Sequence, residues 1–212
     1  MKTYPAMLNL SGRLVAVIGA GTTGLRKVRS LCDAGAKVRL IAGKNFNPGC
    51  ELPDDVEVLA EDFDSKTSTR LLEDCRLIFA CCNDRKTNSE IAAVSRKLGI
   101  WVNVADQPED CDFFCPAVLC NGDVTIAIGT GGNAPGLSAE LKKFISRNLP
   151  ADTGRFAESL SHLRAELKNS CHDPSARQAA MKKLSSEEGY AAFASRGEHG
   201  LREMLSGLQG GN

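Results

Sequence analysis

The sequence predicts an α/β fold that opens with a parallel sheet and continues through a small β and helix segment into a helical C-terminal region. Strand-like and helix-like apolar patterns alternate along roughly the first half of its 212 residues. A glycine-rich turn joins the first predicted strand to the first predicted helix. After Pro150 every pattern is helical. The alternation of strand and helix patterns in the first half of the chain is typical of βαβ units.

Five short apolar runs are the predicted strands, at residues 13–19, 36–42, 56–62, 76–82 and 100–106. Two amphipathic runs, 24–35 and 87–99, are the predicted helices. Each ends at a glycine, Gly35 or Gly99, as helices commonly do. Strands that are joined through helices of this length run parallel.

The pattern changes near Asp112. Residues 112–132 read as two β segments joined by a turn at 121–123, which has the sequence Asn-Gly-Asp. Residues 135–149 form the next predicted helix, with a proline at its start.

The tail after Pro150 is predicted to be helical. One apolar stripe consists of Phe156, Leu160, Leu163 and Leu167, and we expect it to be core rather than a partner-binding face. Further helices are expected from Asp173-Pro174 and over 198–208. The expected domains are therefore 1–112, 113–150 and 151–212.

The composition favours a cytoplasmic protein. Twenty-six basic residues balance twenty-six acidic ones, which argues against nucleic-acid and membrane-surface partners. No apolar run reaches the roughly 18 residues of a membrane span, and the N-terminus lacks the long apolar core of a secretory signal. Nine cysteines are an odd number, which indicates a reducing compartment rather than a disulfide framework.

The glycine turn fits the G-x-G-x-x-G pattern with the strand and helix that this pattern requires. Gly19 would permit the tight turn, Gly21 would let the backbone approach a pyrophosphate, and Gly24 would let the helix pack on the strand. With Thr22 and Thr23 they form the predicted dinucleotide-binding turn, as in a Rossmann-like domain. The alternative is a strand–helix turn that needs glycine for geometry alone.

The end of the second predicted strand leaves the choice between NAD and NADP open. A carboxylate usually holds the ribose 2′-hydroxyl there, but the sequence reads Leu-Ile-Ala-Gly-Lys-Asn. Ala42 is the residue of this strand end that we expect at the cofactor. Lys44 could meet a 2′-phosphate or could be a solvated cation.

Two further segments are candidates for the substrate site. Asp106 stands at the carboxyl end of the fifth predicted strand, where ligands of open α/β sheets bind, so it could take a proton or could cap a turn. Residues 129–140 form a glycine turn before a helix, whose first N–H groups would suit a substrate carboxylate or be capped by Asn133.

A resident metal is not expected. Cys111, Cys115 and Cys120 have no standard zinc spacing, so buried free thiols are the simpler interpretation. The three histidines, His162, His172 and His199, all lie in the tail.

Taken in order, four stretches carry a family resemblance: YPAMLNLSGRLVAVIGAGTTGLRKVRSLCDAGAKVRLIA, ACCNDRKTNSEIA, WVNVADQPEDCDFFCPAV and VTIAIGTGGNAPGLSAELKKFI. Through them, over about residues 4–150, the chain resembles the precorrin-2 dehydrogenase and sirohydrochlorin ferrochelatase family. This family comprises the N-terminal module of siroheme synthase and its stand-alone relatives. The helical tail matches only in general character.

The resemblance implies NAD(P)-dependent oxidation of precorrin-2 to sirohydrochlorin, with NAD as the expected cofactor and NADP as the alternative. Some relatives also insert ferrous iron, so Fe²⁺ is a possible second substrate. Asp106 occupies the position of the family's catalytic aspartate. Thr130 stands where some relatives have a serine that lines the substrate site, and the neighbouring Gly131, Gly132 and Asn133 are assigned to the same site.

The resemblance also implies a homodimer, with 113–150 as the dimerisation segment and the tetrapyrrole cleft between subunits. As a hypothesis, the nicotinamide lies near Asn83 and Asp84. Cations that could face the substrate carboxylates are Arg26, Lys27, Lys142, Lys143 and Arg147, although such side chains are usually only solvated.

Two rival interpretations remain. One is a nucleotide-sensing Rossmann module without catalysis, which does not account for Asp106. The other is a chelatase that has lost the dehydrogenase activity, which does not account for the three glycines.

Overall fold

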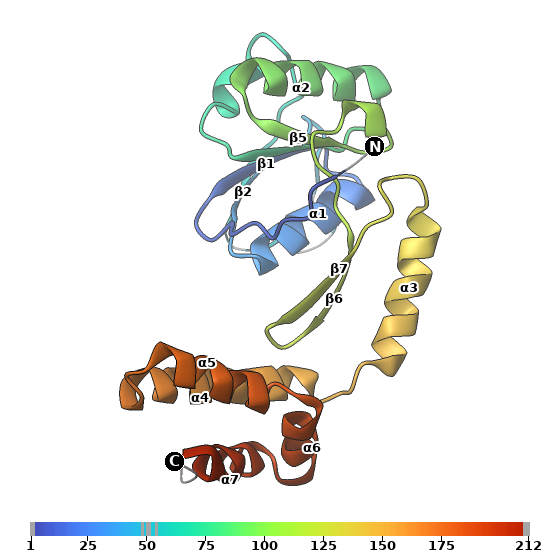
Figure 1. Ribbon diagram of the computed structural model, residues 1–212. Helices are drawn as coiled ribbons and strands as arrows, with labels where there is room; N and C mark the ends of the chain where they lie inside the picture. Colours follow the sequence, from blue (N-terminus) through green and yellow to red (C-terminus); the bar gives the residue numbers. More distant parts are fainter. Residues whose placement is uncertain (1–2, 48, 50–51, 54, 210–212) are drawn as a thin grey trace. The chain divides into compact units, whose positions relative to one another are not determined.

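The computed structural model describes residues 3–47, 49, 52–53 and 55–209, which form two compact units (Figure 1). The first unit contains the chain up to Cys115 together with Gly131–Asn133. The second contains Pro116–Thr130 and the chain from Ala134 onward. Each unit buries an apolar core of its own. The division into 1–112, 113–150 and 151–212 stays a prediction.

The first unit is built on a five-stranded sheet in which all strands are parallel. Its strands are β1 (Leu14–Ile18), β2 (Lys37–Ile41), β3 (Val56–Leu59), β4 (Leu77–Ala80) and β5 (Trp101–Val104). They lie in the order β3-β2-β1-β4-β5, with Val17 opposite Leu40 of β2 and Phe79 of β4. This is the strand order of a Rossmann sheet, so the predicted fold class is confirmed.

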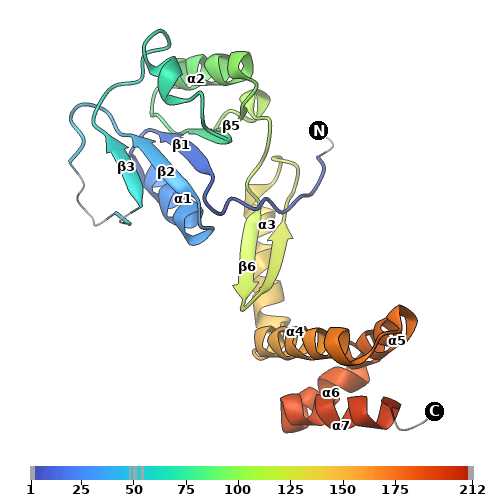
Figure 2. The same ribbon diagram turned by 90° about the vertical axis from the view of Figure 1, so that its left-hand side faces the viewer.

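Helices cover both faces of this sheet (Figures 1 and 2), namely α1 (Thr22–Asp33) and α2 (Arg85–Leu98). Successive residues of β1 point to opposite faces. Val17 packs in the cluster that contains Val28 of α1, whereas Ile18 packs in the cluster that contains Ile91 of α2. A strand covered on both faces must be apolar at every position, which explains its continuous apolar sequence.

Element boundaries differ from the predicted ones by a few residues. α1 begins at Thr22 rather than at residue 24, and α2 begins at Arg85 rather than at 87, where the Asp84 side chain caps it. β3 ends at Leu59 rather than at 62, because its partner strand β2 ends at Ile41. Two short 3-10 helices, η1 (Ser68–Leu71) and η2 (Pro108–Asp110), lie in connecting segments.

The second unit begins with the predicted hairpin, formed by β6 (Ala117–Asn121) and β7 (Val124–Ile128). Gly122 has a φ of +54° in its turn, a conformation that glycine adopts at no steric cost. α3 (Pro135–Asn148) packs against the hairpin. The Asn121 side chain connects the hairpin to the tail, since its Oδ1 accepts from the Gly154 N–H at 3.2 Å.

The tail consists of α4 (Thr153–Ser170), α5 (Pro174–Leu184), α6 (Glu187–Arg196) and α7 (Glu198–Gln209). The predicted apolar stripe belongs to its core: Leu163 and Leu167 are buried, and Phe156 and Leu160 pack against the same cluster. The prediction that this stripe is core is therefore confirmed. Within the described residues, no helix is long and apolar enough to cross a membrane.

The sequence pattern does not separate α6 from its neighbours. Its start depends on a close backbone approach, because a Cβ on Gly189 would lie 1.9 Å from the Leu184 carbonyl oxygen. The Ser186 hydroxyl accepts from the Gly189 N–H at 3.3 Å and caps the helix. These contacts are invisible to a periodicity argument, which explains why the helix was missed.

Leu201→Ala should destabilise the tail, whereas Leu208→Ala in the same helix should not. Leu201 is fully buried (0% exposed), and Leu208 is 43% exposed. Removing a buried leucine side chain typically costs about 2–5 kcal/mol, and surface substitutions stay within about 0.5 kcal/mol. Urea unfolding followed by far-UV circular dichroism measures both. Equal losses for the two variants would contradict the core described here.

Candidate functional site

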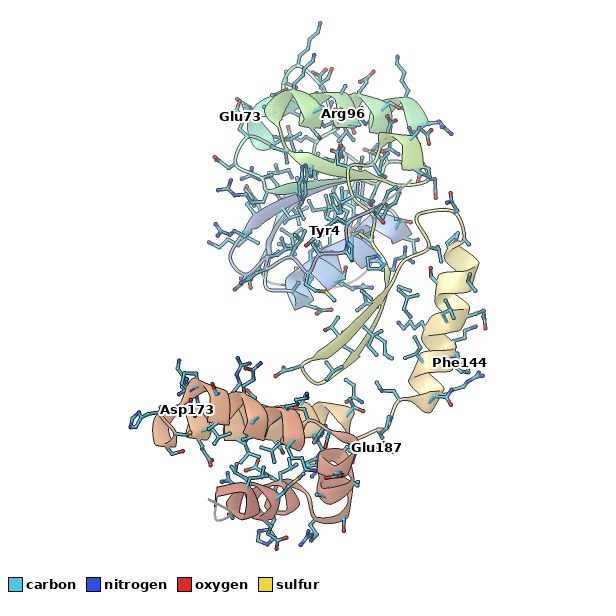
Figure 3. The ribbon with its side chains drawn as sticks, viewed as in Figure 1. Tyr4, Glu73, Arg96, Phe144, Asp173 and Glu187 are labelled. Carbon is cyan, nitrogen blue, oxygen red and sulfur yellow. The ribbon has the colours of Figure 1, made fainter. Side chains whose placement is uncertain are left out.

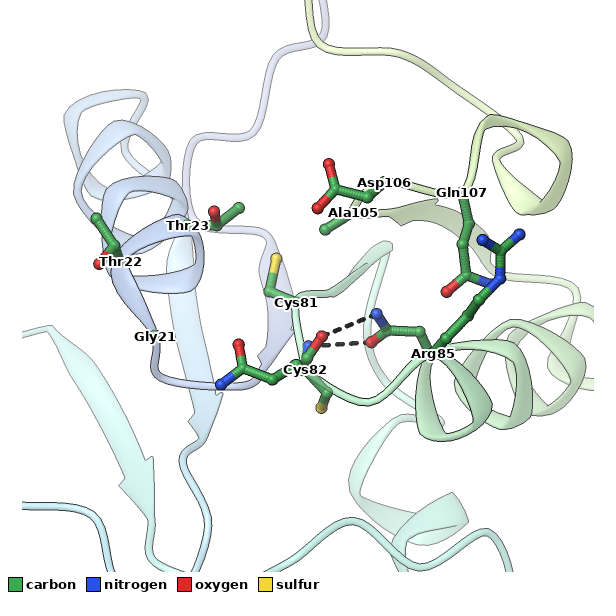
Figure 4. Close-up of a pocket in the computed structure, with 11 residues that line it drawn as sticks. Gly21, Thr22, Thr23, Cys81, Cys82, Arg85, Ala105, Asp106 and Gln107 are labelled. Carbon is green, nitrogen blue, oxygen red and sulfur yellow. Dashed lines mark hydrogen bonds between the residues drawn. The ribbon is translucent and has the colours of Figure 1, made fainter.

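The site lies where the strand order of the sheet reverses. From β1 the chain proceeds to β2 on one side, and β4 lies on the other side of β1. Ligands of open α/β sheets bind in the crevice at such a point, outside the carboxyl ends of the strands. A pocket of about 330 Å³ opens there (Figure 4). Segments that follow β1, β4 and β5 line it, with Gly21, Thr22, Thr23, Cys81, Cys82, Asn83, Arg85, Asn88, Ala105, Asp106 and Gln107.

Two of the three predicted glycines hold the geometry of the turn. Gly19 has a φ of +102°, and a Cβ there would lie 2.4 Å from the Cys81 carbonyl oxygen. A Cβ on Gly24 would lie 1.9 Å from the Gly19 carbonyl oxygen. Real Cβ atoms do not approach backbone so closely, so neither position accepts a side chain without a shift. Neither residue lines the pocket.

Gly21 has a different role, because the space in front of it is open. The nearest atom to a Cβ there would be Asn83 Oδ1 at 3.8 Å. Gly21 is also the N-cap of α1, and no side chain of the described residues caps that helix. The first-turn N–H groups and the helix dipole favour an anion at this point. The turn therefore fits the pyrophosphate of a dinucleotide, with Thr22 and Thr23 beside it.

The segment after β4 is fixed by a buried amide. Asn88 of α2 is 3% exposed, accepts from the Cys82 N–H and donates to the Cys82 carbonyl, both at 3.0 Å (Figure 4). These two hydrogen bonds fix the backbone at Cys82, and the next residue, Asn83, lines the pocket. Burial raises the pKa of the Cys81 and Cys82 thiols to about 11, so both stay protonated at neutral pH.

The carboxylate of Asp84 caps the N-terminus of α2. It accepts from the Thr87 hydroxyl at 2.6 Å and from the Thr87 N–H at 2.8 Å. These hydrogen bonds lower the pKa of Asp84. Of the two residues predicted near the nicotinamide, Asn83 lines the pocket, whereas Asp84 caps α2.

Asp106 lines the pocket at the carboxyl end of β5, in a conformation that few residue types adopt. Its φ is +59°, and among the described residues it is the one non-glycine with a positive φ. Aspartate and asparagine tolerate this left-handed region better than other side chains. Backbone outliers that the surroundings hold in place are often found at functional sites.

The turn that carries Asp106 is anchored on both sides. Ala105 donates its N–H to the Ala80 carbonyl of β4 at 2.9 Å. On the other side Gln107 is buried, and its amide donates to Ser89 Oγ of α2 at 2.9 Å and to Asp110 Oδ2 at 3.0 Å. The carboxylate of Asp106 is therefore exposed to the pocket from a rigid turn.

Arg85 is the cation that lines this pocket, and it pairs with Glu109. Among the cations expected near the substrate, Lys27 lies with Nζ 5.4 Å from the ring centroid of Phe79. Lys142, Lys143 and Arg147 are exposed on α3 of the second unit, and Arg26 is exposed on α1 of the first.

The structure places the other predicted residues outside the pocket lining. Ala42 donates its N–H to the Leu59 carbonyl at 2.9 Å. In the first unit, Gly131 and Gly132 have φ values of +64° and +82°, and Asn133 follows them as an exposed residue. In the second unit, the Thr130 hydroxyl lies 3.1 Å from that of Ser138.

Sequence reasoning missed Arg85, Asn88 and Gln107. Asn88 had a usable signal, since it is a polar residue on the helical face that also carries the buried Ile91 and Ala92. A polar group on such a face needs a partner, and here the partner is the backbone of the site. Arg85 and Gln107 are placed by turns whose course the sequence does not indicate.

The expectation of buried free thiols holds only in part. Cys111, Cys115 and Cys120 are free, but Cys115 and Cys120 are exposed, the latter on the outward face of β6. Cys111 is partly buried, and its Sγ accepts from the Val104 N–H at 3.2 Å. Burial raises the pKa of Cys111. Throughout the described part of the chain, no three His, Cys, Asp or Glu residues gather as a candidate metal site.

In the comparison with known proteins, a family model matches the part of the chain that contains this pocket. The family model described as "Putative NAD(P)-binding" (NAD_binding_7) matches residues 6–117, more than half of the chain. The match covers the glycine turn, the end of β4 and Asp106.

Curated relatives are siroheme synthases. That of Nitrosococcus oceani is 29% identical over 212 residues, which cover 100% of this chain and 45% of that protein. That of Gluconobacter oxydans is 36% identical over 165 residues, which cover 76% of this chain and 35% of that protein. The chain thus spans less than half the length of these relatives.

One solved structure, described as SirC, precorrin-2 dehydrogenase, matches with a TM-score of 0.73 and 20% sequence identity. The match covers 96% of this chain and 99% of that one. It shows that the chain shares this fold, including the helical C-terminal region.

Gly21→Ala should weaken nucleotide binding by a folded protein, whereas Gly24→Ala should disturb the fold. At Gly21 the φ of −71° and ψ of 179° suit alanine, and the space is open. A methyl group there would separate the backbone from a phosphate. The loss of one hydrogen bond to a charged group weakens binding about ten- to hundredfold.

At Gly24 a methyl group meets the Gly19 carbonyl, and overpacking of this kind costs about 1–3 kcal/mol or more. Titration calorimetry with NAD⁺ and thermal unfolding measure the two effects. A Gly21→Ala variant that binds NAD⁺ normally, or a Gly24→Ala variant of unchanged stability, would contradict these roles.

Proposed function

We propose a function on the premise that this chain belongs to the NAD(P)-binding family whose model it matches. The chain oxidises precorrin-2 to sirohydrochlorin, a step of siroheme biosynthesis, with NAD⁺ as hydride acceptor and NADP⁺ as the alternative. Its likeness to siroheme synthases and the fold that it shares with SirC support this proposal.

One observation of the structure carries the proposal: a carboxylate faces the same pocket as an anion cradle. Asp106 and the Gly21–Thr23 segment line one cavity from neighbouring strand ends. A nucleotide-sensing module needs the cradle but has no use for a carboxylate held in a left-handed conformation opposite it. A dehydrogenase needs the cradle to hold its nucleotide and the carboxylate to serve as a base on the substrate beside that nucleotide.

The chemistry divides between cofactor and protein. NAD(P)⁺, when bound, accepts a hydride from the carbon skeleton of precorrin-2. The oxidation also releases a proton, and Asp106 is the group of the pocket placed to accept it. General-base assistance of this kind typically contributes about 10²–10⁴-fold to a rate. Arg85 also lines the pocket, but it is paired with Glu109, so a carboxylate of the substrate would have to displace that partner.

The proposal is tested by anaerobic incubation of the full chain with precorrin-2 and either NAD⁺ or NADP⁺, following the sirohydrochlorin spectrum. Conversion that depends on the nucleotide supports the dehydrogenase. Adding Fe²⁺ afterwards tests whether the chain also inserts iron, as the family resemblance implies for some members. Folded protein that converts nothing with either nucleotide would overturn the proposal.

Asp106→Asn should lower the rate of precorrin-2 oxidation by about 10²–10⁴-fold and leave NAD⁺ binding nearly unchanged. Asparagine is chosen because it tolerates the φ of +59° that alanine would strain. Asp33→Asn, at the exposed last residue of α1, is the matched control and should keep the full rate. An Asp106→Asn enzyme as fast as the control would remove Asp106 from the mechanism.

We also propose that the chain is a homodimer and that one face of α3 belongs to the interface. Leu137, Leu141 and Phe144 follow the i, i+4, i+7 spacing of one helical face and are 53%, 38% and 63% exposed (Phe144 is labelled in Figure 3). Exposed apolar residues that gather in this way mark association sites. A second copy of the chain is the partner that the family resemblance implies.

Phe144→Asp should convert the dimer into a monomer, because it buries a charge in an apolar interface. Ser146→Asp places the same charge on the opposite side of α3, about 140–180° around the helix from the three apolar residues, and should leave the dimer intact. Light scattering coupled to size-exclusion chromatography measures both. A monomeric wild-type protein, or a dimeric Phe144→Asp variant, would refute this interface.

A further inference from the structure

The end of β2 lacks the group that a dinucleotide site normally provides there. In Rossmann domains a carboxylate after the second strand binds the ribose 2′-hydroxyl and thereby favours NAD. Residues 42–47 of this chain contain none. Lys44, the charged residue of this segment, would instead suit the 2′-phosphate of NADP.

The register of the sheet brings a carboxylate to this place from another strand. Pairing between β2 and β3 continues past both strand ends, since Ala42 donates to the Leu59 carbonyl at 2.9 Å and Gly43 donates to the Glu61 carbonyl at 3.1 Å. The next residue, Asp62, therefore lies beside the chain that leaves β2. Its Oδ1 accepts from the Lys44 N–H at 3.2 Å.

Asp62 also forms an ion pair with the nearby cation, Lys44. Its Oδ2 lies 3.7 Å from Lys44 Nζ. An incoming phosphate group would have to displace this carboxylate from the ammonium group and would then face its negative charge. Lys44 is thus paired on the protein rather than held ready for a phosphate.

Gly43 lies within contact distance of the Asp62 carboxylate and has a backbone conformation that favours glycine. It has a φ of +85°, and a Cβ there would lie 3.5 Å from Asp62 Oδ1. The carboxylate therefore rests against bare backbone at the strand end. Because the Asp62 side chain is 66% exposed, a ligand can reach it from solvent.

We propose that Asp62 selects NAD⁺ over NADP⁺, in place of the carboxylate that is missing after β2. It accepts a hydrogen bond from the ribose 2′-hydroxyl, repels a 2′-phosphate and neutralises Lys44. This inference rests on the proposed nucleotide-dependent function and names the residue that sets its cofactor specificity. No local sequence motif indicates this role of Asp62, because Asp62 and Lys44 are 18 residues apart.

Equilibrium binding of NAD⁺ and NADP⁺ to the full chain, by titration calorimetry, tests the proposal independently of catalysis. Wild-type protein should bind NAD⁺ at least about tenfold more tightly than NADP⁺. Asp62→Asn removes the charge and keeps the size of the side chain. It should tighten NADP⁺ binding by about fivefold or more and weaken NAD⁺ binding, so that the preference is largely lost.

Two further variants make the result specific. Glu73→Gln removes one negative charge at another exposed residue of the first unit (labelled in Figure 3) and should keep the wild-type preference. Asp62→Asn combined with Lys44→Ala should lose the gained NADP⁺ affinity, because that gain comes from the released ammonium group. Thermal unfolding confirms that each variant is folded.

The outcomes separate this inference from the function on which it rests. If wild-type protein binds neither nucleotide, the proposed function fails and this inference fails with it. If wild-type and Asp62→Asn proteins bind both nucleotides with the same ratio of affinities, the function stands and the role of Asp62 is overturned.

Discussion

The close approach of two backbone segments, the turn after β1 and the end of β4, is the constraint on which the site depends. Cys81 donates its N–H to the Ile18 carbonyl at 2.7 Å, and its own carbonyl occupies the space that a side chain on Gly19 would need. Gly24 then allows α1 to lie directly against Gly19. A side chain at either glycine would move the start of α1 away from the sheet. The anion cradle is thus a product of strand spacing, not of a polar side chain.

The two helices that begin at this edge of the sheet differ in how the free N–H groups of their first turns are satisfied. Asp84 accepts hydrogen bonds from the first turn of α2 and places a negative charge at its positive end. Gly21 is the N-cap of α1, and nothing in the described part of the chain supplies this helix with a side-chain cap. Its N–H groups must therefore be satisfied by solvent or by a ligand. This difference directs an anionic ligand to α1, although both helix starts lie beside one pocket.

Much of the first unit could be predicted because its signals are local. Continuous apolar strands, the helical period of α2 and the left-handed Gly99 at its end all follow from neighbouring residues. Gly21 and Asp106 could be proposed for the same reason, since each directly follows a strand. Asp62 could not, because it reaches the end of β2 only through the register of β3. The role of Asp84 shows the opposite error, where a polar residue after a strand serves its own helix.

The rigid placement of Asp106 links the fold to the proposed chemistry. A positive φ costs free energy in any residue other than glycine, so the surroundings must hold it. They do so through Ala105, whose N–H binds the Ala80 carbonyl of β4, and through the buried Gln107, whose partner Ser89 belongs to α2. The same two elements carry the braced turn at Cys82 that contributes Asn83 to the pocket. The distance between carboxylate and cradle is therefore set by the spacing of β1, β4 and β5. A carboxylate held at the end of β5 by β4 and α2 needs no ordering when the substrate arrives, which is the condition for efficient proton transfer.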